Sequence, residues 1–327
     1  MHLVILSAVA LHLREDDVEK VLEMDAVIAA VARATADLGR GTAQNQPRRR
    51  VYPPGGVLNV MFASDPGSGY YGLKTYSIGG GTVRFLVLLY REDGNIVAMV
   101  EANRLGAYRT GAASAVAAQR LAPSGPQEVA VIGTGWQART QVHAISRTLQ
   151  NAHFRVFGRD AERRSAFVDE IREHLGVRAD AAASAEDAVR GAGVIVTITP
   201  SATPVIEADW VAEGALVIGA GTNQPHKAEL PSELIRRAGT VVVDQLEAAR
   251  LESGDLITAE ASGQFDWKNV VELGAILAGK ESGRHSPGEI VVFESHGLAL
   301  WDIASAALVY EEAVRARLGN QVELFGF

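Results

Sequence analysis

The chain has 327 residues, of which 47% are hydrophobic and 21% charged, and this composition is typical of a folded globular protein. Its length exceeds the size at which a single hydrophobic core stops growing, so two domains are expected. Lys and Arg number 31 against 39 Asp and Glu, a formal net charge of −8, which argues against nucleic acid or an anionic membrane as the general partner. The absence of cysteine excludes disulfides, a thiolate nucleophile and cysteine-ligated metals, and it suits a cytoplasmic protein.

The first residues, MHLVILSAVALHLREDD, contain a short apolar run that resembles the hydrophobic core of a signal peptide. No Lys or Arg precedes the run, however, and charges follow from Arg14. No stretch of the chain reaches the roughly 18 apolar residues of a membrane-spanning helix. We therefore expect a protein that is not secreted and does not associate with a membrane.

The first third of the chain predicts a small α+β domain. Residues 16–41 place apolar side chains near helical spacing that ends at Gly39, which predicts one amphipathic helix or two. Between residues 51 and 100, four β-rich runs are separated by Pro- and Gly-rich turns, and this spacing predicts antiparallel strands. An Ala-rich helix is expected over 103–122. The segment PSGPQ then breaks the chain like a domain boundary, so the first domain is expected to span residues 1–122.

From Glu128 onward the sequence alternates between strand and helix signals. Short apolar runs (VAVIG, HFRVFG, GVIVTIT, LVIGAG and TVVVD) are separated by amphipathic segments such as QVHAISRTL and ERRSAFVDEIREHL. This alternation predicts a parallel sheet with crossover helices, that is, a Rossmann-type doubly wound α/β domain over 127–302. The last helix, expected within 303–327, is predicted to pack back on the first domain.

The turn after the first of these strands has a Gly-x-Gly-x-x-Ala pattern. In such a turn the first glycine allows a tight bend, the second lets the backbone approach a pyrophosphate, and the third position needs a small residue. The pattern is weak alone, but here it follows a strand and opens a helix, where backbone N–H groups favour an anion. We therefore predict a cofactor-binding turn formed by Gly133, Gly135, Trp136, Gln137 and Ala138.

The end of the second strand distinguishes the two nicotinamide cofactors. An acid there usually binds the adenosine ribose of NAD, whereas a basic residue suits the phosphate of NADP. Gly158 stands where the acid is expected, Arg159 follows it, and Asp160 comes late. The sequence thus favours NADP, bound through Arg159, with NAD as the alternative; a solvated helix start is the alternative interpretation of the arginine.

Several distant segments together resemble the ornithine cyclodeaminase and mu-crystallin family over nearly the whole chain. They are YRTGAASAVAAQRLA, VIGTGWQA, GTNQPHKAEL, VVVDQLEAARLESGDL and SHGLALWDIASAALVY. That family includes ornithine and lysine cyclodeaminases, an alanine dehydrogenase branch and NAD(P)H-dependent reductases of cyclic ketimines. The resemblance implies a homodimer in which the first domain binds substrate and pairs with its partner through its sheet.

The resemblance also implies that three cations bind a substrate carboxylate. We assign them to Arg49, with Arg50 as the alternative register, and to Lys74 and Arg109. The chemistry is sound, because an arginine fork matches a carboxylate and a buried lysine has a pKa that falls readily. An unpaired charge within the Ala-rich helix would be costly, which supports a ligand role for Arg109. The neighbouring Thr110 either donates to a cofactor phosphate or caps locally.

One position departs from the cyclodeaminase pattern. Those enzymes place an aspartate two residues before the proline of the segment GTNQPHKAEL, whereas this chain has Asn223 there. An amide is not a general base, so simple cyclodeamination is doubtful. We expect Lys74 to donate a proton and Asn223 to orient the substrate; the alternative for Asn223 is an Asx-turn residue before a proline loop.

The remaining cofactor contacts are predicted near strand ends. Thr199 and Ser201 are expected to line the cofactor, although both residue types also close turns, and Gly297 matches a family loop near the nicotinamide. Asp302 is interpreted as an acid at a helix N-terminus rather than a catalyst. The eight histidines show no metal-like pairing, so no metal is assigned.

The resulting hypothesis is an NAD(P)-dependent oxidoreductase that transfers hydride at the α-carbon of an imino or amino acid. Two alternatives remain: an ornithine cyclodeaminase, which is an ammonia lyase using catalytic NAD, and a non-enzymatic protein of the mu-crystallin type that binds NADPH and a ligand. Net consumption of reduced cofactor distinguishes the first two, and the presence of Lys74 and Arg109 disfavours a purely binding role.

Overall fold

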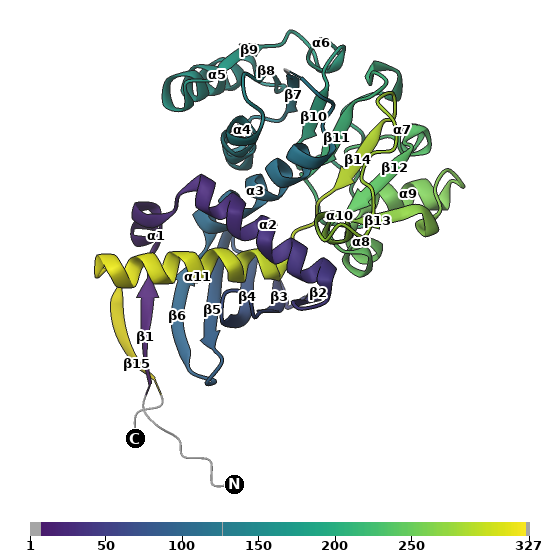
Figure 1. Ribbon diagram of the computed structural model, residues 1–327. Helices are drawn as coiled ribbons and strands as arrows, with labels where there is room; N and C mark the ends of the chain where they lie inside the picture. Colours follow the sequence, from purple (N-terminus) through teal and green to yellow (C-terminus); the bar gives the residue numbers. More distant parts are fainter. Residues whose placement is uncertain (1–7, 126, 325–327) are drawn as a thin grey trace. The chain divides into compact units, whose positions relative to one another are not determined.

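The computed structural model describes residues 8–125 and 127–324, and the chain divides into two compact units (Figure 1). Unit 1 comprises residues 1–109 and 298–327, and unit 2 comprises residues 110–297. The first division falls inside the Ala-rich helix α3 (Asn103–Leu121) and not at the Pro-rich segment after it. Among the described residues, no helix combines the length and apolar character that crossing a membrane requires.

Unit 1 contains a seven-stranded sheet in the order β15-β1-β6-β5-β4-β3-β2. Its neighbouring strands are antiparallel except for β1 and β6, which run parallel. The expected antiparallel runs form the centre of the sheet. The strands are β1 (Ala8–Leu13), β2 (Gln44–Val51), β3 (Gly56–Asp65), β4 (Tyr70–Gly79), β5 (Thr82–Arg91), β6 (Ile96–Glu101) and β15 (Asn320–Leu324).

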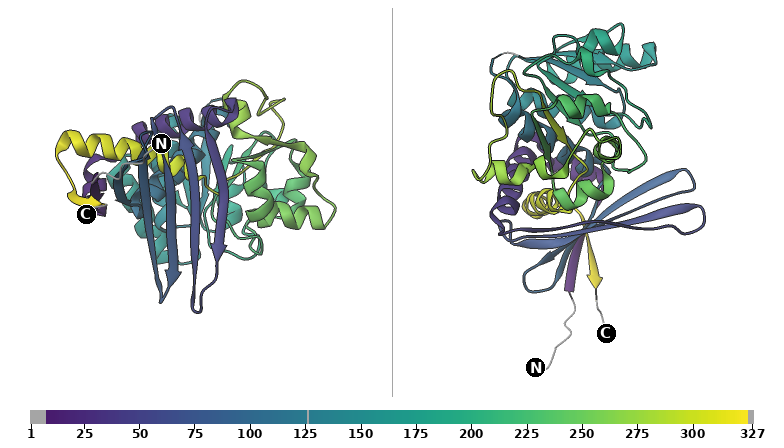
Figure 2. Two further views of the ribbon diagram at one scale, coloured as in Figure 1. Left: turned by 90° about the horizontal axis from the view of Figure 1, so that it is seen from below. Right: turned by 90° about the vertical axis from the view of Figure 1, so that its right-hand side faces the viewer.

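Helices of unit 1 cover one face of this sheet. They are α1 (Glu15–Val21), α2 (Met24–Arg40) and α11 (Ala299–Ala316). Figure 2 shows α2 and α11 on one side of the strands and no helix of this unit on the other. The first nine residues of α11, rich in Ala, are buried, so this end of the helix is a central part of the core.

The structure corrects one sequence prediction about the chain ends, and for another it describes only part of the segment concerned. The C-terminal segment is not helical to residue 327, because α11 ends at Ala316, Arg317 adopts a left-handed conformation with φ 56°, and β15 pairs with β1. The last three residues lie outside the described part. The apolar start considered as a signal lies partly outside it as well, and its described portion is strand β1.

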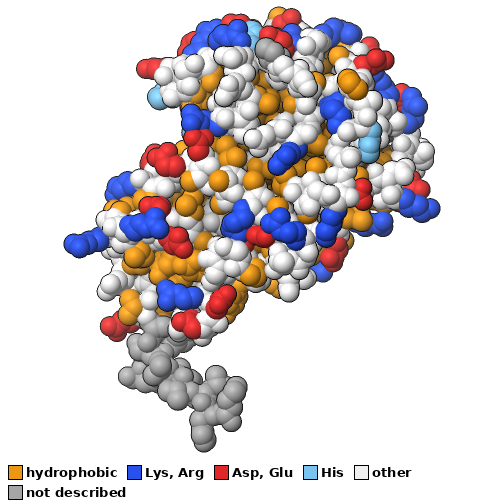
Figure 3. Space-filling view, in the orientation of Figure 1, with side chains coloured by type: hydrophobic (Ala, Val, Ile, Leu, Met, Phe, Trp, Pro, Cys, Tyr) orange, Lys and Arg blue, Asp and Glu red, His pale blue; other side chains and the backbone are white. Residues whose placement is uncertain are grey.

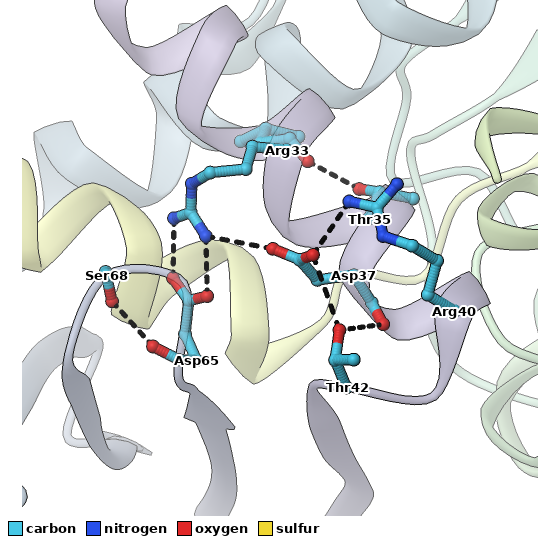
Figure 4. Close-up of polar contacts among 8 residues, drawn as sticks. Arg33, Thr35, Asp37, Arg40, Thr42, Asp65 and Ser68 are labelled. Carbon is cyan, nitrogen blue, oxygen red and sulfur yellow. Dashed lines mark hydrogen bonds and ion pairs between the residues drawn. The ribbon is translucent and has the colours of Figure 1, made fainter.

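An ion pair between half-buried Arg33 and buried Asp65 fixes α2 to the sheet (Figure 4). Arg33 donates to both carboxylate oxygens of Asp65, at 2.8 and 2.7 Å, and also to Asp37 at 3.2 Å. Asp65 ends β3 and is fully buried, so breaking the pair would leave an uncompensated buried charge. The helical layer is therefore held over the face of the sheet on which Lys74 lies.

Unit 2 contains an eight-stranded, fully parallel sheet in the order β13-β12-β14-β11-β10-β7-β8-β9. Strands β10, β11, β12 and β14 are buried at every position, which their continuous apolar sequences predict for a sheet covered on both faces. The strands are β7 (Glu128–Ile132), β8 (His153–Phe157), β9 (Arg178–Ala181), β10 (Val194–Thr197), β11 (Leu216–Gly219), β12 (Thr240–Val243), β13 (Val270–Glu272) and β14 (Val291–Glu294).

This topology confirms the predicted Rossmann-type doubly wound sheet. The order reverses between β7 and β10, and ligands of such sheets bind outside the carboxyl ends of the strands at this switch point. The crossover helices are α4 (Trp136–Thr148), α5 (Ala161–Leu175), α6 (Ala185–Val189), α7 (Ser232–Arg237), α8 (Leu246–Glu252), α9 (Gly254–Ala261) and α10 (Leu273–Leu277). On the face shown in Figure 3, basic and acidic side chains are interspersed.

Candidate functional site

The glycine turn of unit 2 lies at the switch point. Gly133 has φ +128°, and a Cβ atom there would lie 2.4 Å from the carbonyl oxygen of Ile198, which follows β10. Ala138 is fully buried where α4 begins. A Cβ atom on Gly135 would meet nothing within 4 Å, so the backbone at the N-terminus of α4 is open to an approaching anion. Trp136 and Gln137 are exposed beside it.

The end of β8 has no room for the acid typical of NAD sites. A Cβ atom on Gly158 would lie 2.8 Å from the side chain of Thr134 in the glycine turn. Asp160 is the N-cap of α5, where its carboxylate accepts the N–H of Arg163 at 3.0 Å. Arg159 between them is exposed. The position is thus compatible with a cationic contact to a bound phosphate and poor for a carboxylate.

The loop after β10 is held by an acid that the sequence analysis did not single out. Glu229 accepts the N–H of Thr199 and pairs with its hydroxyl, each at 2.7 Å, and it accepts the N–H of Gly221 at 2.8 Å. Ser201 donates to the carbonyl oxygen of Thr203 at 2.7 Å. The side chains of Thr199 and Ser201 therefore stabilise loops, and Glu229 joins the ends of β10 and β11.

Burial also changes the electrostatics of Glu229. Burial raises the pKa of Glu229 to about 7, opposed by the hydrogen bonds from Thr199 and Gly221. Its own N–H donates to Asp255 at 2.7 Å. Burial and the neighbouring Glu294 raise the pKa of Asp255. The sequence contains a signal for this residue, because Glu229 stands within the segment KAELP directly before a leucine that is buried. The spacing of the sequence alone did not reveal the hydrogen-bond partners of Glu229.

The loop that carries Gly297 is held in a similar way. The N–H groups of His296 and Gly297 both donate to Asp244 at 2.7 Å, and Gly297 has φ +85°. The His296 ring lies between Asp244, at 3.6 Å, and Glu294, at 3.5 Å. Burial alone would lower the pKa of His296, but the two carboxylates raise it to about 10, so the ring is cationic.

Unit 1 contains a buried cluster built from three elements. Lys74 on β4 lies with its Nζ 2.7 Å from Asp302 Oδ1, and Arg109 on α3 has its Nε 3.1 Å from the same oxygen. Asp302 lies in the first turn of α11, as predicted, and is fully buried. Lys74 and Arg109 are 3% and 8% exposed. The structure thus brings together two of the predicted cations, Lys74 and Arg109, and places the carboxylate of Asp302 between them.

The third cation nearest this cluster is Arg48, not the predicted Arg49. Through β3, Arg49 aligns with Thr75, so its side chain lies on the sheet face opposite Lys74 and is exposed. Arg48 is 5% exposed, and its guanidinium lies 5.9 Å from the ring centroid of Tyr76 on the face of Lys74. The alternative Arg50 donates to Asn59 at 3.1 Å. The geometry moves the assignment by one residue, because side chains alternate along a strand.

The cluster makes Lys74 a candidate acid. Burial lowers the pKa of Lys74 to about 8, Asp302 opposes the shift, and Arg109 and Arg48 add to it. A lysine with such a pKa exchanges its proton near neutral pH, which general acid catalysis requires. A Cβ atom on Gly106 would lie 3.1 Å from the ammonium, so α3 passes close to it.

The last predicted residues lie in unit 2. Thr110 is buried in α3, and Asn223 is half-buried in the loop after β11. No group of three or more His, Asp or Glu side chains with metal-binding geometry occurs among the residues that the structure describes.

The fold defines the class: a Rossmann-type unit joined to a second α+β unit. The family model of the ornithine cyclodeaminase/mu-crystallin family matches residues 9–317. The chain belongs to this family, which confirms the resemblance seen in its motifs.

Three relatives within the family are similar along nearly their whole length. The chain is 34% identical over 322 residues to an alanine dehydrogenase of Archaeoglobus fulgidus, covering 96% of this chain and 98% of that protein. A Thermococcus litoralis Δ1-pyrroline-2-carboxylate reductase in complex with NADH and L-proline has 31% identity and a TM-score of 0.90, covering 95% and 100% of the two chains. An archaeal alanine dehydrogenase dimer with bound NAD has 33% identity and a TM-score of 0.90, covering 96% and 99%. The predicted class, an oxidoreductase acting on carbon–nitrogen bonds, is the class of these relatives.

Proposed function

We propose that the protein is an NADP-dependent oxidoreductase that interconverts an imino acid and the corresponding amino acid by hydride transfer at the α-carbon. The observation that carries this proposal is the cluster in unit 1, where Lys74 and Arg109 share a single carboxylate and the charge of Arg48 acts on Lys74. Two buried cations on one anion favour an additional anion, and a substrate carboxylate supplies it.

The roles within the cluster follow from side-chain chemistry. The guanidinium groups of Arg48 and Arg109 present planar forks of donors that match a carboxylate, so these two side chains are suited to hold it. Lys74 has a pKa of about 8 and is suited to give a proton to the substrate nitrogen during reduction and to take it back in the reverse direction. When bound, the reduced nicotinamide supplies the hydride.

The cofactor preference rests on the end of β8. The open backbone at Gly135 and the tight contact at Gly133 fit a pyrophosphate on the N-terminus of α4. Arg159 would then bind the phosphate that distinguishes NADP, because Asp160 already caps α5. NAD is the alternative, since the similar solved structures contain NADH or NAD.

Deamination with ring closure is disfavoured by Asn223. A cyclodeaminase needs a base near the substrate side chain, and the carboxamide of Asn223 does not supply one. Asn223 is instead assigned to orienting the substrate by hydrogen bonding. The archaeal reductase bound to L-proline makes a cyclic imino acid a reasonable first substrate to test.

The uncovered face of the sheet in unit 1 is assigned to a homodimer contact. A shallow groove on this face is lined by polar and aromatic side chains, among them Phe62, Tyr71 and Tyr90. Phe62 is 49% exposed, and Tyr71 stacks on Tyr90 with ring centroids 5.3 Å apart. Exposed apolar area of this kind marks an interface, and the similar alanine dehydrogenase is a dimer.

A spectrophotometric screen tests the proposed activity. Cyclic and linear imino acids are supplied with NADPH or NADH, and the corresponding amino acids with the oxidised cofactors. We expect net loss of reduced cofactor with at least one imino acid and faster turnover with NADPH. Release of ammonia from ornithine without a net change in the redox state of the cofactor would instead establish the cyclodeaminase.

A further inference from the structure

One oxygen of Asp302 is not explained by the cluster as described so far. Its Oδ1 accepts hydrogen bonds from both Lys74 and Arg109. Its Oδ2 is buried and has no hydrogen-bond partner among the residues that the structure describes. A buried acceptor left without a donor is unfavourable and rare in folded proteins, and a charged one is more so. The structure therefore leaves one acceptor beside two cations available for a donor from outside the chain.

The charges of the cluster restrict what that donor is. Arg48, Lys74 and Arg109 attract a carboxylate, but they repel the ammonium of an amino acid or the iminium of a protonated imino acid. A site that accepts such a substrate needs a negative group at the nitrogen. Burial would raise the pKa of Asp302, but Arg109 and Lys74 hold it below its usual value, so this side chain is the ionised carboxylate of the cluster.

We propose that Asp302 is a catalytic residue whose Oδ2 accepts a hydrogen bond from the substrate nitrogen. Lys74 and the substrate nitrogen then share one counter-ion. This inference rests on the proposed function and deepens it, because it assigns recognition of the nitrogen to a residue distinct from those that hold the carboxylate.

The arrangement explains how a proton moves at low cost. During reduction the Nζ–H bond of Lys74 breaks and an N–H bond forms on the imine nitrogen, while the hydride adds to the α-carbon as the C=N double bond becomes a single bond. The proton transfer moves the positive charge from Lys74 to the substrate nitrogen, and hydride addition then leaves a neutral amine, with the charge on the oxidised cofactor. Because both nitrogens contact Asp302, the charge stays beside the same carboxylate during the proton transfer, and that step needs little reorganisation of the surroundings.

Matched ligands isolate recognition of the nitrogen. L-proline is compared with the isostere that has oxygen in place of the ring nitrogen, and L-alanine is compared with L-lactate. Affinities are measured by calorimetry on the full chain saturated with reduced cofactor. The wild type is expected to prefer the nitrogen member of at least one pair by about 10- to 100-fold, the range for a hydrogen bond to a charged group. In Asp302→Asn this preference is expected to fall to near unity.

Arg48→Gln serves as the control, since a group that holds the carboxylate should weaken both members of a pair by the same factor. If the Arg48 variant behaves so while Asp302→Asn keeps the wild-type preference, the role of Asp302 is wrong and the proposed function stands. If the wild type binds no member of either pair, the proposed function itself fails, and the inference with it.

Asp302→Ser provides a second neutral variant, because it leaves room for water beside both cations. The same loss of preference is expected there. If both neutral variants fail to fold while Asp302→Glu folds with an unchanged preference for nitrogen, Asp302 serves the fold rather than the substrate, and the proposal is overturned.

Discussion

Each unit contains a buried cluster of charged side chains, and the two clusters differ in how their charges are satisfied. In unit 1, Lys74 and Arg109 share one carboxylate, Asp302, whose Oδ2 has no hydrogen-bond partner among the described residues. In unit 2, the cluster has more carboxylates than cations, and its cation is the ring of His296. Two of the carboxylates accept backbone N–H groups. Glu229 accepts those of Thr199 and Gly221, and Asp244 accepts those of His296 and Gly297.

The difference separates a binding site from a scaffold. Glu229 and Asp244, which accept backbone amides, fix the loops at the carboxyl ends of β10, β11 and β14. Glu294 Oε1, beside His296, is also a buried acceptor without a hydrogen-bond partner among the described residues, but the neighbouring cation is a ring held within the same cluster. A cluster with surplus positive charge is incomplete until an anion arrives. Buried charge is thus informative about function only when the partners of each atom are counted, because a perturbed pKa occurs in both clusters.

The largest effect is expected when Lys74, the proposed proton donor of the cluster in unit 1, is replaced. Lys74→Met keeps an unbranched side chain in the buried position but has no proton to give, so kcat for imine reduction should fall by about 10²- to 10⁴-fold. In the wild type the rate should decline as pH rises through about 8, where Lys74 loses its proton. Steady-state kinetics across pH measures both effects. Lys268→Met, at an exposed position, is the control, and equal activity of the two variants would contradict the role of Lys74.

A matched pair of adjacent arginines tests which face of β2 binds the carboxylate. Arg48→Gln should weaken substrate binding by about 2 to 4 kcal/mol, because it removes a buried charge that contacts the ligand. Arg49→Gln should change it by less than about 0.5 kcal/mol, as expected for an exposed side chain away from the site. Substrate affinity of the two variants measures the difference. The reverse order of effects would show that Arg49, and not Arg48, binds the substrate carboxylate.

A change in the cluster of unit 2, at Glu229, should alter the stability of the fold and not substrate binding. Folding raises the pKa of Glu229 from 4.5 to about 7, so the stability that it contributes is present below pH 4.5 and is lost as pH rises through about 7. Between about pH 5 and pH 8, the wild type should lose about 2 to 3 kcal/mol more unfolding free energy than Glu229→Gln. Denaturant unfolding at several pH values measures this. Glu233→Gln, exposed on α7, should keep the wild-type slope, and equal slopes in all three proteins would disprove the titration of Glu229.

An exposed cation on unit 2 should have the smallest effect. Arg159→Ala should weaken NADPH by about tenfold or less and leave NADH nearly unchanged, because the arginine is assigned only to the additional phosphate. Fluorescence titration with both cofactors gives the two dissociation constants. Arg163→Ala, at an exposed position on α5, is the control. Tighter binding of NADH than of NADPH by the wild type would show that the cofactor is NAD.

Much of the fold could be predicted because local patterns carry it. The buried strands of unit 2 are continuous apolar runs, and the glycine turn follows one of them directly. Strands β2 and β15 were missed because their sequences are mostly polar. The apolar start was not recognised as β1, since its partners β6 and β15 lie far along the chain.

The candidate site was less predictable than the fold for the same reason. The register of β2 shifts between Gln46 and Arg49, and no sequence pattern places such a bulge. The assignment of Arg49 rested on the family's Pro-x-Arg position, which does not show on which face of the strand each arginine lies. The pairing of Lys74 with Asp302 joins residues 228 positions apart. The role of Glu229 depends on loops that meet only once the parallel sheet has formed.

Hydride transfer at the α-carbon is tested most directly by isotope. Reduced cofactor carrying deuterium at the transferable position is incubated with the full chain and an imino acid that it accepts, and the amino acid product is analysed by mass spectrometry. The proposed reaction places one deuterium on the α-carbon for each cofactor oxidised, and Lys74→Met makes the transfer slow. An amino acid product without deuterium, or ammonia released while the label stays on the cofactor, would contradict it.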